Sequence, residues 1–411
     1  MEQLRHMSEW ATDHLLGKLY PFWKNLRDDE NGGFYGYVSY DLKTDTQAFK
    51  GCILMSRITW FFSNIFLLYK EGLLDRDKFG EYGITPEEVL DLARHGYRFI
   101  TEKCIDRENG GIFWSVDCKG NPEDTTKHTY NQAFCVYALS SYFDASGDMD
   151  ALEAAIDMAE LIEAKCRDDK GYLEAQSREF GPEENDKLSE NGVMADRTMN
   201  TLLHVFEAYT ELYRVSGSPY YQNRIAALAD DFVVQIYEPE LHRLGVFFND
   251  EFETIIDLHS FGHDIEAAWL IEKGCRISGY DFLAEKTDPM IKDLTETIFS
   301  KAFDGRSLPA ESENGIVNER RDWWVQAEAV LGFLNGYLRE EREEYLDGAI
   351  HELDFIKEHV FDKRNGSEWF YRVDKGGDPD TSEAMVEEWK CPYHNGRMCM
   401  ELIRANATGM L

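Results

Sequence analysis

The sequence of 411 residues is poor in basic side chains, with 43 lysines and arginines against 78 aspartates and glutamates. The formal net charge of −35 argues against nucleic acids and anionic membrane surfaces as partners, because both would repel the protein. A neutral or cationic ligand is compatible with this charge. The charged residues follow the faces of predicted helices, which is the usual pattern of a solvated surface.

Several other features are missing. No apolar run is predicted to be long enough to cross a bilayer, and the first seven residues lack the apolar core of a signal peptide. The eight cysteines form no C-x-x-C pair, so we expect them to be reduced in a cytoplasmic protein. No Pro/Ser-rich linker divides the chain, and we expect residues 1–411 to form one domain.

A turn followed by a short aromatic or apolar run recurs six times, at intervals of roughly 60 to 80 residues, which indicates an internal repeat. An amphipathic helix precedes each turn, and a more apolar helix follows it. The amphipathic stretches, interpreted as outer helices, are 8–26, 86–104, 148–166, 219–237, 289–303 and 343–360. The apolar stretches, interpreted as inner helices, begin near Gly51, Thr129, Ala195, Gly262, Asp322 and Pro392.

This alternation predicts an all-α fold, an (α/α)6 barrel of six inner and six outer helices with short β-hairpin-like turns at the rim. The alternative is an open helical solenoid. Closure is favoured because six repeats fill the chain and because a closed ring buries both of its ends.

Two histidines are predicted to lie in the first turns of inner helices. Ser260 is a plausible N-cap for the helix that carries His263, and Glu266 follows on the same face. The helix dipole favours the neutral imidazole and the carboxylate favours the charged one, which predicts a pKa near neutrality. Pro392 suits a first helical position and places His394 in the same setting. The alternative for each is a buried structural histidine.

Further polar and aromatic residues fall near the starts of the other inner helices. They are Arg57, His128, Tyr130, Asn131, Asn200, His204, Asp322 as a possible N-cap, Trp323, Trp324 and Trp389. Each has a structural alternative, such as a carboxylate partner for Arg57 or a helix–helix hydrogen bond between Asn200 and His204. Trp323 and Trp324 point about 100° apart on a helix, so one is expected in the core and the other against a sugar.

The motifs of several other chemistries are absent. There is no H-E-x-x-H motif or cysteine cluster for a metal, no nucleotide-binding glycine loop in the right context, and no G-x-S-x-G elbow. We therefore expect no metal and no nucleotide cofactor.

The chain resembles the N-acylglucosamine 2-epimerase superfamily, and within it the cellobiose 2-epimerases. The resemblance spans nearly the whole chain and is specific as a combination. It is carried by the runs 22–37, 56–61, 127–131, 189–192, 198–200, 259–266, 323–328 and 389–397.

The resemblance implies an (α/α)6 barrel and reversible epimerisation at C2 of the reducing-end glucose of β-1,4-linked disaccharides such as cellobiose and lactose. It implies that His263 and His394 are an acid/base pair that works through a cis-enediolate, and that Arg57 and Glu266 assist them. It also implies that the substrate is surrounded by Tyr130, Asn200, His204, Trp324 and Trp389. No cofactor is required, since the reaction involves no net oxidation.

Other functions stay open from the sequence. They are a monosaccharide aldose–ketose isomerase, an N-acylglucosamine 2-epimerase, an inverting glycosidase with carboxylates about 6.5–9.5 Å apart, and a non-catalytic carbohydrate-binding protein. We expect a disaccharide as the partner, no nucleic acid or membrane, and a monomer or weak dimer in the cytoplasm.

Overall fold

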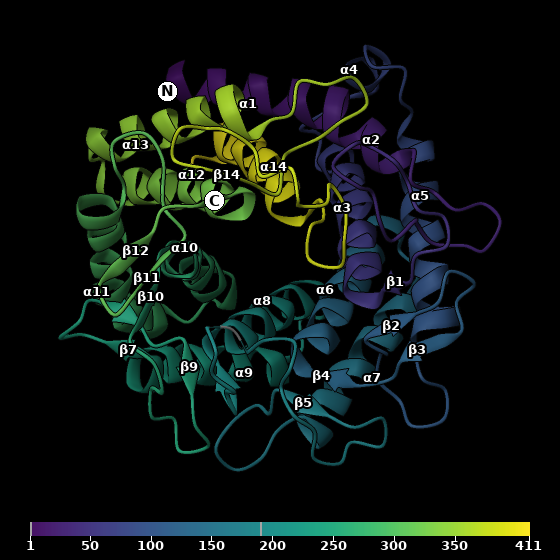
Figure 1. Ribbon diagram of the computed structural model, residues 1–411, viewed down its shortest axis with the longest axis horizontal. Helices are drawn as coiled ribbons and strands as arrows, with labels where there is room; N and C mark the ends of the chain where they lie inside the picture. Colours follow the sequence, from purple (N-terminus) through teal and green to yellow (C-terminus); the bar gives the residue numbers. More distant parts are fainter. Residues whose placement is uncertain (1, 190) are drawn as a thin grey trace.

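The computed structural model describes residues 2–189 and 191–411. Glu190, which belongs to the run 189–192 used for the resemblance, lies outside the described residues. The helices form two concentric rings around one axis, an (α/α)6 barrel (Figure 1). The predicted fold class is therefore confirmed.

The inner ring consists of six apolar helices that are buried over most of their surface. They are α3 (Cys52–Lys70), α6 (Thr129–Ser146), α8 (Met199–Ser216), α10 (Phe261–Ser278), α12 (Trp323–Glu340) and α14 (Tyr393–Thr408). Each inner helix packs against the next, and α14 packs back against α3. The inner ring is thus closed, which excludes the open solenoid.

The outer ring consists of amphipathic helices that cover the inner ones. They are α1 (Glu2–His14) continued by α2 (Tyr20–Lys24), α5 (Pro86–Phe99), α7 (Met149–Lys165), α9 (Pro219–Asp231), α11 (Asp281–Thr297) and α13 (Glu343–Phe355), and a short α4 (Arg76–Gly80) connects α3 to α5. Two begin earlier than predicted, α1 at Glu2 and α11 at Asp281. Pro289 lies inside α11 instead of starting it.

Four outer helices end in a π-helical turn. These turns span Ile100–Cys104, Phe232–Ile236, Ile298–Ala302 and Ile356–Val360, and a fifth, Leu15–Leu19, lies between α1 and α2. In the first of them, the backbone N–H of Ile105 donates to the carbonyl of Ile100 at 3.2 Å. The bond closes the helix end and turns the chain toward the rim.

Short strands join neighbouring repeats at one end of the barrel. They are β1 (Lys50–Gly51), β2 (Ser115–Val116), β3 (Pro122–Asp124), β4 (Lys127–His128), β5 (Ala175–Gln176), β6 (Arg197–Thr198), β7 (Tyr237–Glu238), β8 (Arg243–Leu244), β9 (Phe247–Phe248), β10 (Leu258–Ser260), β11 (Glu311–Glu313), β12 (Ile316–Asn318), β13 (Arg321–Asp322) and β14 (Arg372–Val373). The strand before an inner helix pairs with a strand of the next repeat, as β1–β2, β4–β5, β6–β9, β10–β11 and β13–β14. An antiparallel bridge between Val38 and Val386 joins the last repeat to the first.

A buried ion pair recurs where the chain enters an inner helix. Lys50 is two residues ahead of α3, and its Nζ lies 2.7 Å from the Asp28 carboxylate in the preceding turn. The same offset before α6, α8 and α12 gives the pairs Lys127–Asp106, Arg197–Asp168 and Arg321–Asp304. The pair fixes the turn to the rim, and so fixes the first turn of the inner helix.

The eight cysteines are free thiols, as predicted. The prediction that no apolar run is long enough to cross a bilayer was wrong for α3. By length and composition this helix could do so, but 89% of its apolar window is buried inside the barrel. Its hydrophobicity is that of a core helix.

Candidate active site

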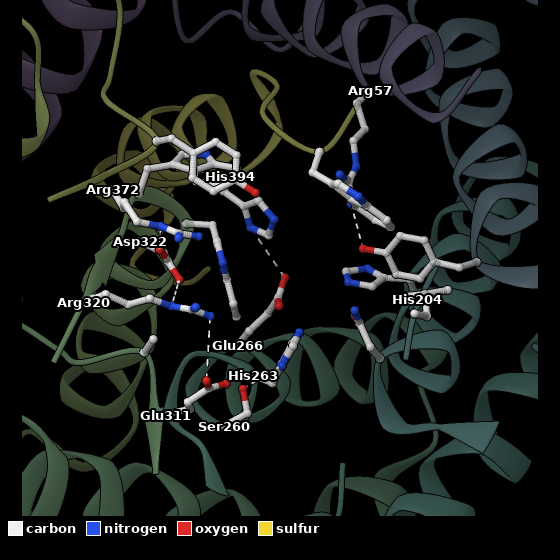
Figure 2. Close-up of a pocket in the computed structure, with 18 of the residues that line it drawn as sticks. Arg57, His204, Ser260, His263, Glu266, Glu311, Arg320, Asp322, Arg372 and His394 are labelled. Atoms are coloured by element: carbon white, nitrogen blue, oxygen red, sulfur yellow. Dashed lines mark hydrogen bonds and ion pairs between the residues drawn. The ribbon is translucent and has the colours of Figure 1, made fainter. Parts of the chain in front are cut away.

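The nine residues that the resemblance assigned to the site all line one cavity of about 170 Å³ at the strand end of the barrel (Figure 2), whereas the candidates His128 and Asn131 do not line it. The nine are Arg57, Tyr130, Asn200, His204, His263, Glu266, Trp324, Trp389 and His394. They come from all six inner helices and, for Trp389, from the segment before α14. The alternative in which each is an unrelated core or loop residue does not explain this convergence.

His263 is the third residue of α10, and its Nδ1 lies 2.8 Å from Ser260 Oγ. Ser260 is at the N-cap position, but it makes no capping hydrogen bond because its hydroxyl is engaged by the imidazole. Contrary to prediction, no hydrogen bond or ion pair joins Glu266 to His263. Burial, and then the nearby His204, lower the pKa of His263 to about 3 instead of leaving it near neutrality.

His394 has a carboxylate partner, since its Nδ1 lies 2.8 Å from Glu328 Oε1 and 3.8 Å from Glu266 Oε1. A carboxylate accepts, so Nδ1 carries a proton and the other ring nitrogen is the basic one in neutral imidazole. Burial, followed by the charges of Arg397 and Arg57, lowers the pKa of His394. Pro392 is the N-cap residue of α14, one position before the predicted place.

The two imidazoles share one indole as a neighbour. The ring centre of Trp324 lies 4.7 Å from that of His263 and 5.5 Å from that of His394. Gly262 permits this arrangement, because a Cβ at that position would meet the Trp324 ring at 2.6 Å. Figure 2 shows both imidazoles entering the cavity from different sides, with Glu266 between them.

A buried charge cluster lies behind the imidazoles. Arg397 contacts Glu266 and lies 2.7 Å from both Glu328 Oε1 and Glu207 Oε1. Burial and the neighbouring Glu328 raise the pKa of Glu266 to about 8. The pKa of Glu207 falls to about 2 despite its burial, because Arg397 and then His204 stabilise its charged form. The cluster therefore has one carboxyl, Glu266, that holds a proton at neutral pH.

Three members of this network, Glu207, Glu328 and Arg397, were missed from the sequence. Glu328 also accepts from the Trp269 indole at 2.9 Å, and Glu207 accepts from His204 at 2.9 Å. Each is on an inner helix, one turn beyond a nominated residue. That spacing, a charged residue at i+3 or i+4 on a buried face, was the available signal.

A metal would find ligand atoms in this network. The donor atoms of Glu266, Glu328 and His394 lie within 4.8 Å of one another. The Arg397 guanidinium already contacts both carboxylates, so it occupies the place where a metal would neutralise them. The residues present do not fit a divalent cation unless Arg397 moves.

Arg57 provides a positive charge on the cavity wall. Its Nη2 donates to the Tyr130 hydroxyl at 2.7 Å, and its guanidinium packs 4.1 Å from the centre of the Phe134 ring. Within residues 2–189 and 191–411, no carboxylate forms an ion pair with Arg57. The alternative that Arg57 pairs with a carboxylate is therefore wrong for these residues. An uncompensated guanidinium in a buried wall suits an oxyanion that forms during a reaction.

The remaining nominated residues surround the same space. Trp389 packs beside Trp114 and Tyr130, with ring centres 5.6 and 5.9 Å away. The side-chain oxygen of Asn200 is buried and has no hydrogen-bond partner in the described part of the chain, so it is available to a ligand. His204 forms a hydrogen bond with Glu207 and not with Asn200. This excludes the alternative of a hydrogen bond between Asn200 and His204.

A closed α/α barrel with two imidazoles, an unpaired guanidinium and tryptophans around one cavity defines an enzyme of carbohydrate acid/base chemistry. Residues 80–395 match the family model described as N-acylglucosamine 2-epimerase (GlcNAc 2-epimerase), and the chain belongs to that family.

The chain is similar to relatives of known name along nearly its full length. It is 47% identical to a cellobiose 2-epimerase from Eubacterium cellulosolvens over 97% of this chain and 98% of that one. A solved structure of a sugar epimerase from a ruminal bacterium superposes with a TM-score of 0.91 at 43% identity, covering 97% and 98% of the two chains. The cellobiose 2-epimerase of Bacillus thermoamylovorans gives 0.90 at 40% identity, covering 97% and 99%.

Proposed function

We propose that this protein is a cellobiose 2-epimerase that interconverts glucose and mannose at the reducing end of β-1,4-linked disaccharides, cellobiose and lactose among them. The observation that carries the proposal is the pair His263 and His394, two imidazoles from separate helices that line one cavity and contact one indole. Inversion at a carbon without oxidation needs a proton donor and a proton acceptor on opposite faces, and these two side chains supply them.

The reaction begins when the sugar ring opens and C1 becomes an aldehyde. One imidazole removes the C2 proton, and the electron pair of the C–H bond moves toward the carbonyl to give a planar cis-enediolate. The other imidazole donates a ring N–H proton to the opposite face of C2. We assign His394 to the glucose face and His263 to the mannose face.

The other wall residues have roles that follow from their contacts. Arg57, held by Tyr130, stabilises the negative charge that develops on the enediolate oxygen. Glu266 acts on the side of His394 and Arg397, where it holds the proton that balances the cluster. Trp324 and Trp389 present flat apolar faces to the sugar.

Asn200 and His204 offer hydrogen bonds to its hydroxyls. We further propose that the chain works as a single catalytic domain, without a metal or cofactor, as a cytoplasmic monomer or weak dimer.

A single experiment in D₂O tests the proton-transfer mechanism. The enzyme is incubated with cellobiose, and the products are followed by NMR. We expect glucosyl-mannose to appear with deuterium at C2. Epimerisation without any deuterium at C2 would exclude removal of that proton, and release of free glucose would instead identify a glycosidase.

The same assay separates the closest alternatives. A monosaccharide isomerase would convert mannose to fructose in preference to acting on cellobiose, and an N-acylglucosamine 2-epimerase would prefer N-acetylglucosamine. The 47% identity to a cellobiose 2-epimerase over nearly the whole chain favours the disaccharide.

A further inference from the structure

A ladder of opposite charges lines the cavity on the wall away from Arg57 and His204 (Figure 2). The Asp322 carboxylate lies 3.0 Å from Arg320 Nε and 3.0 Å from Arg372 Nε, with one oxygen for each guanidinium. Glu311 continues the ladder 3.8 Å from Arg320. The strand pairing β13–β14 sets Asp322 directly opposite Arg372, so the backbone fixes this geometry.

The fold does not need this ladder. In the fifth repeat the recurring buried pair is supplied by Arg321, whose guanidinium contacts Asp304 and Ser307. Arg320 and Asp322 flank that residue and point to the cavity instead. Arg320 and Asp322 lie three residues and one residue before α12. The residues at the same positions are Phe49 and Gly51 before α3, and Asp196 and Thr198 before α8; neither couple forms an ion pair.

The orientation of Asp322 gives a second reason to assign a ligand to this wall. It holds the N-cap position of α12, where an aspartate side chain ordinarily accepts a hydrogen bond from a backbone N–H of the first helical turn. Here it makes no capping bond, because its carboxylate is turned toward the two arginines. Asp322 is predicted from the sequence to cap the helix, but in the structure its carboxylate binds two guanidinium groups.

Arg320 and Arg372 have N–H groups that Asp322 does not engage. Asp322 engages the Nε of each, and in the described part of the chain no hydrogen bond is made by Nη1 or Nη2 of Arg320 or by Nη2 of Arg372. These N–H groups belong to side chains that line the cavity and are only about a third and a quarter exposed. Fixed, partly buried donors beside carboxylate acceptors suit a ligand that both donates and accepts.

We propose that Arg320, Asp322 and Arg372 form the subsite that binds the hydroxyl groups of the second, outer sugar unit of the substrate. This inference rests on the proposed function, because the inner unit must be the one that reacts between the imidazoles. Trp389, which packs beside Tyr130, belongs to the opposite side of the cavity. The outer sugar therefore has an aromatic platform on one side and the charge ladder on the other.

The charges also define which ligand the subsite takes. In the cavity lining, two arginines face the two carboxylates of Asp322 and Glu311, so the lining part of the ladder is balanced in charge. A neutral polyol finds both donors and acceptors there.

The test compares Arg320→Met and Arg372→Met with the wild type on cellobiose. Each variant keeps the volume of the side-chain stem and removes hydrogen bonds from a charged donor, so we expect KM to rise about tenfold or more. We expect kcat to change much less, since a hydroxyl contact far from C2 binds substrate and transition state alike. A damaged fold would lower kcat as well, so the split between KM and kcat separates a binding role from a structural one.

Binding without turnover provides a second readout. Methyl β-cellobioside cannot open its ring, and its affinity, measured by calorimetry, is expected to fall by the same factor in both variants. Arg342→Met is the matched control, because Arg342 pairs with Glu296 and Glu344 on the outer ring. We expect this control to leave KM, kcat and the affinity unchanged.

Two outcomes would overturn the proposal. One is a KM for cellobiose within twofold of wild type in both arginine variants. The other is a rise caused only by Lys187→Met, which would place the outer sugar on the loop near Trp114. If wild-type enzyme makes no glucosyl-mannose, the proposed function fails instead. The calorimetry with methyl β-cellobioside then still tests the subsite.

Discussion

At the scale of single residues, the two imidazoles differ from the other histidines in what they contact. We expect His263→Ala and His394→Ala each to lower kcat at least about 100-fold, the usual contribution of a positioned acid or base. His242→Ala is the control, because this exposed histidine pairs with Asp293 on the outer ring and is expected to leave kcat unchanged. Epimerisation by either cavity variant at close to the wild-type rate would exclude the two-base mechanism.

The partners of the imidazoles are unequal, and this inequality can be measured. Glu328 stabilises the charged form of His394, whereas the Ser260 hydroxyl beside His263 can donate or accept. Glu328→Gln keeps the shape and removes the charge, so we expect kcat to fall by about 10- to 100-fold with little change in KM. The rate of C2 deuterium exchange from the glucose side should fall with it.

Glu340→Gln at the far end of the same helix is the control for Glu328→Gln. A variant at position 328 with unchanged kcat would show that the carboxylate serves only the packing of Arg397.

The sequence predicted nine residues that line one cavity, but it missed the charge cluster behind them and the pairing of their side chains. A helical spacing of three placed Glu266 on the face of His263, yet Glu266 turns to Arg397 and His394 on α14. Spacing along one helix defines a face, and the partner on that face comes from a helix far away in the sequence. Ser260 is a second example, because its hydroxyl can bond either the helix end or the imidazole, and the sequence does not decide between them.

At the scale of elements, the helices follow from hydrophobic periodicity, and the strands do not. α11 begins at Asp281 and continues through Pro289. Packing against the inner ring outweighs the one backbone hydrogen bond that proline cannot donate. The rim strands are two or three residues long. The pairs β2–β3, β7–β8 and β11–β12 form within a repeat, and the other pairs join neighbouring repeats. Nothing local in the sequence encodes such a pairing.

The recurring buried ion pair predicts how strongly the stability of a rim turn and its inner helix depends on one lysine. Lys50→Met would leave the Asp28 carboxylate buried without a cation, and we expect a loss of about 3 to 5 kcal/mol in the free energy of unfolding. Urea unfolding measures it. Lys170→Met, which removes an exposed pair with Asp250, should change the free energy of unfolding far less, because solvent screens that pair. Equal losses in the two variants would contradict a structural role for the buried pair.

At the scale of the whole molecule, the closed ring was predictable from counting repeats, since six of them fill the chain. The bridge that closes it, between Val38 and Val386, was not, because it joins segments almost a full chain apart. Closure also buries ionisable groups from every repeat in one core. The stability of the barrel must therefore depend on pH as a sum over those groups.

That sum has two opposing parts. Burial lowers the pKa of His14 and His263 to about 3, so these groups stabilise the fold above the unfolded value of 6.5, and their contribution is lost as pH falls. Burial raises the pKa of Glu174 to about 7 and that of Glu266 to about 8, so the protonated carboxyls stabilise the fold at low pH. Their contribution is lost as pH rises from 4.5 through these values.

We expect the free energy of unfolding to be highest near pH 6 and to fall on both sides. Glu174→Gln isolates the alkaline side, because Glu174 is buried and bonds only Thr198 and Thr201. The stability of wild type relative to this variant should decline between pH 5 and 8 by on the order of 3 kcal/mol, and be constant above that. Glu179→Gln, at an exposed position in the same loop, should show no such slope. A wild-type advantage that grows as pH rises would mean that Glu174 is ionised in the folded barrel, and would reverse the sign of this argument.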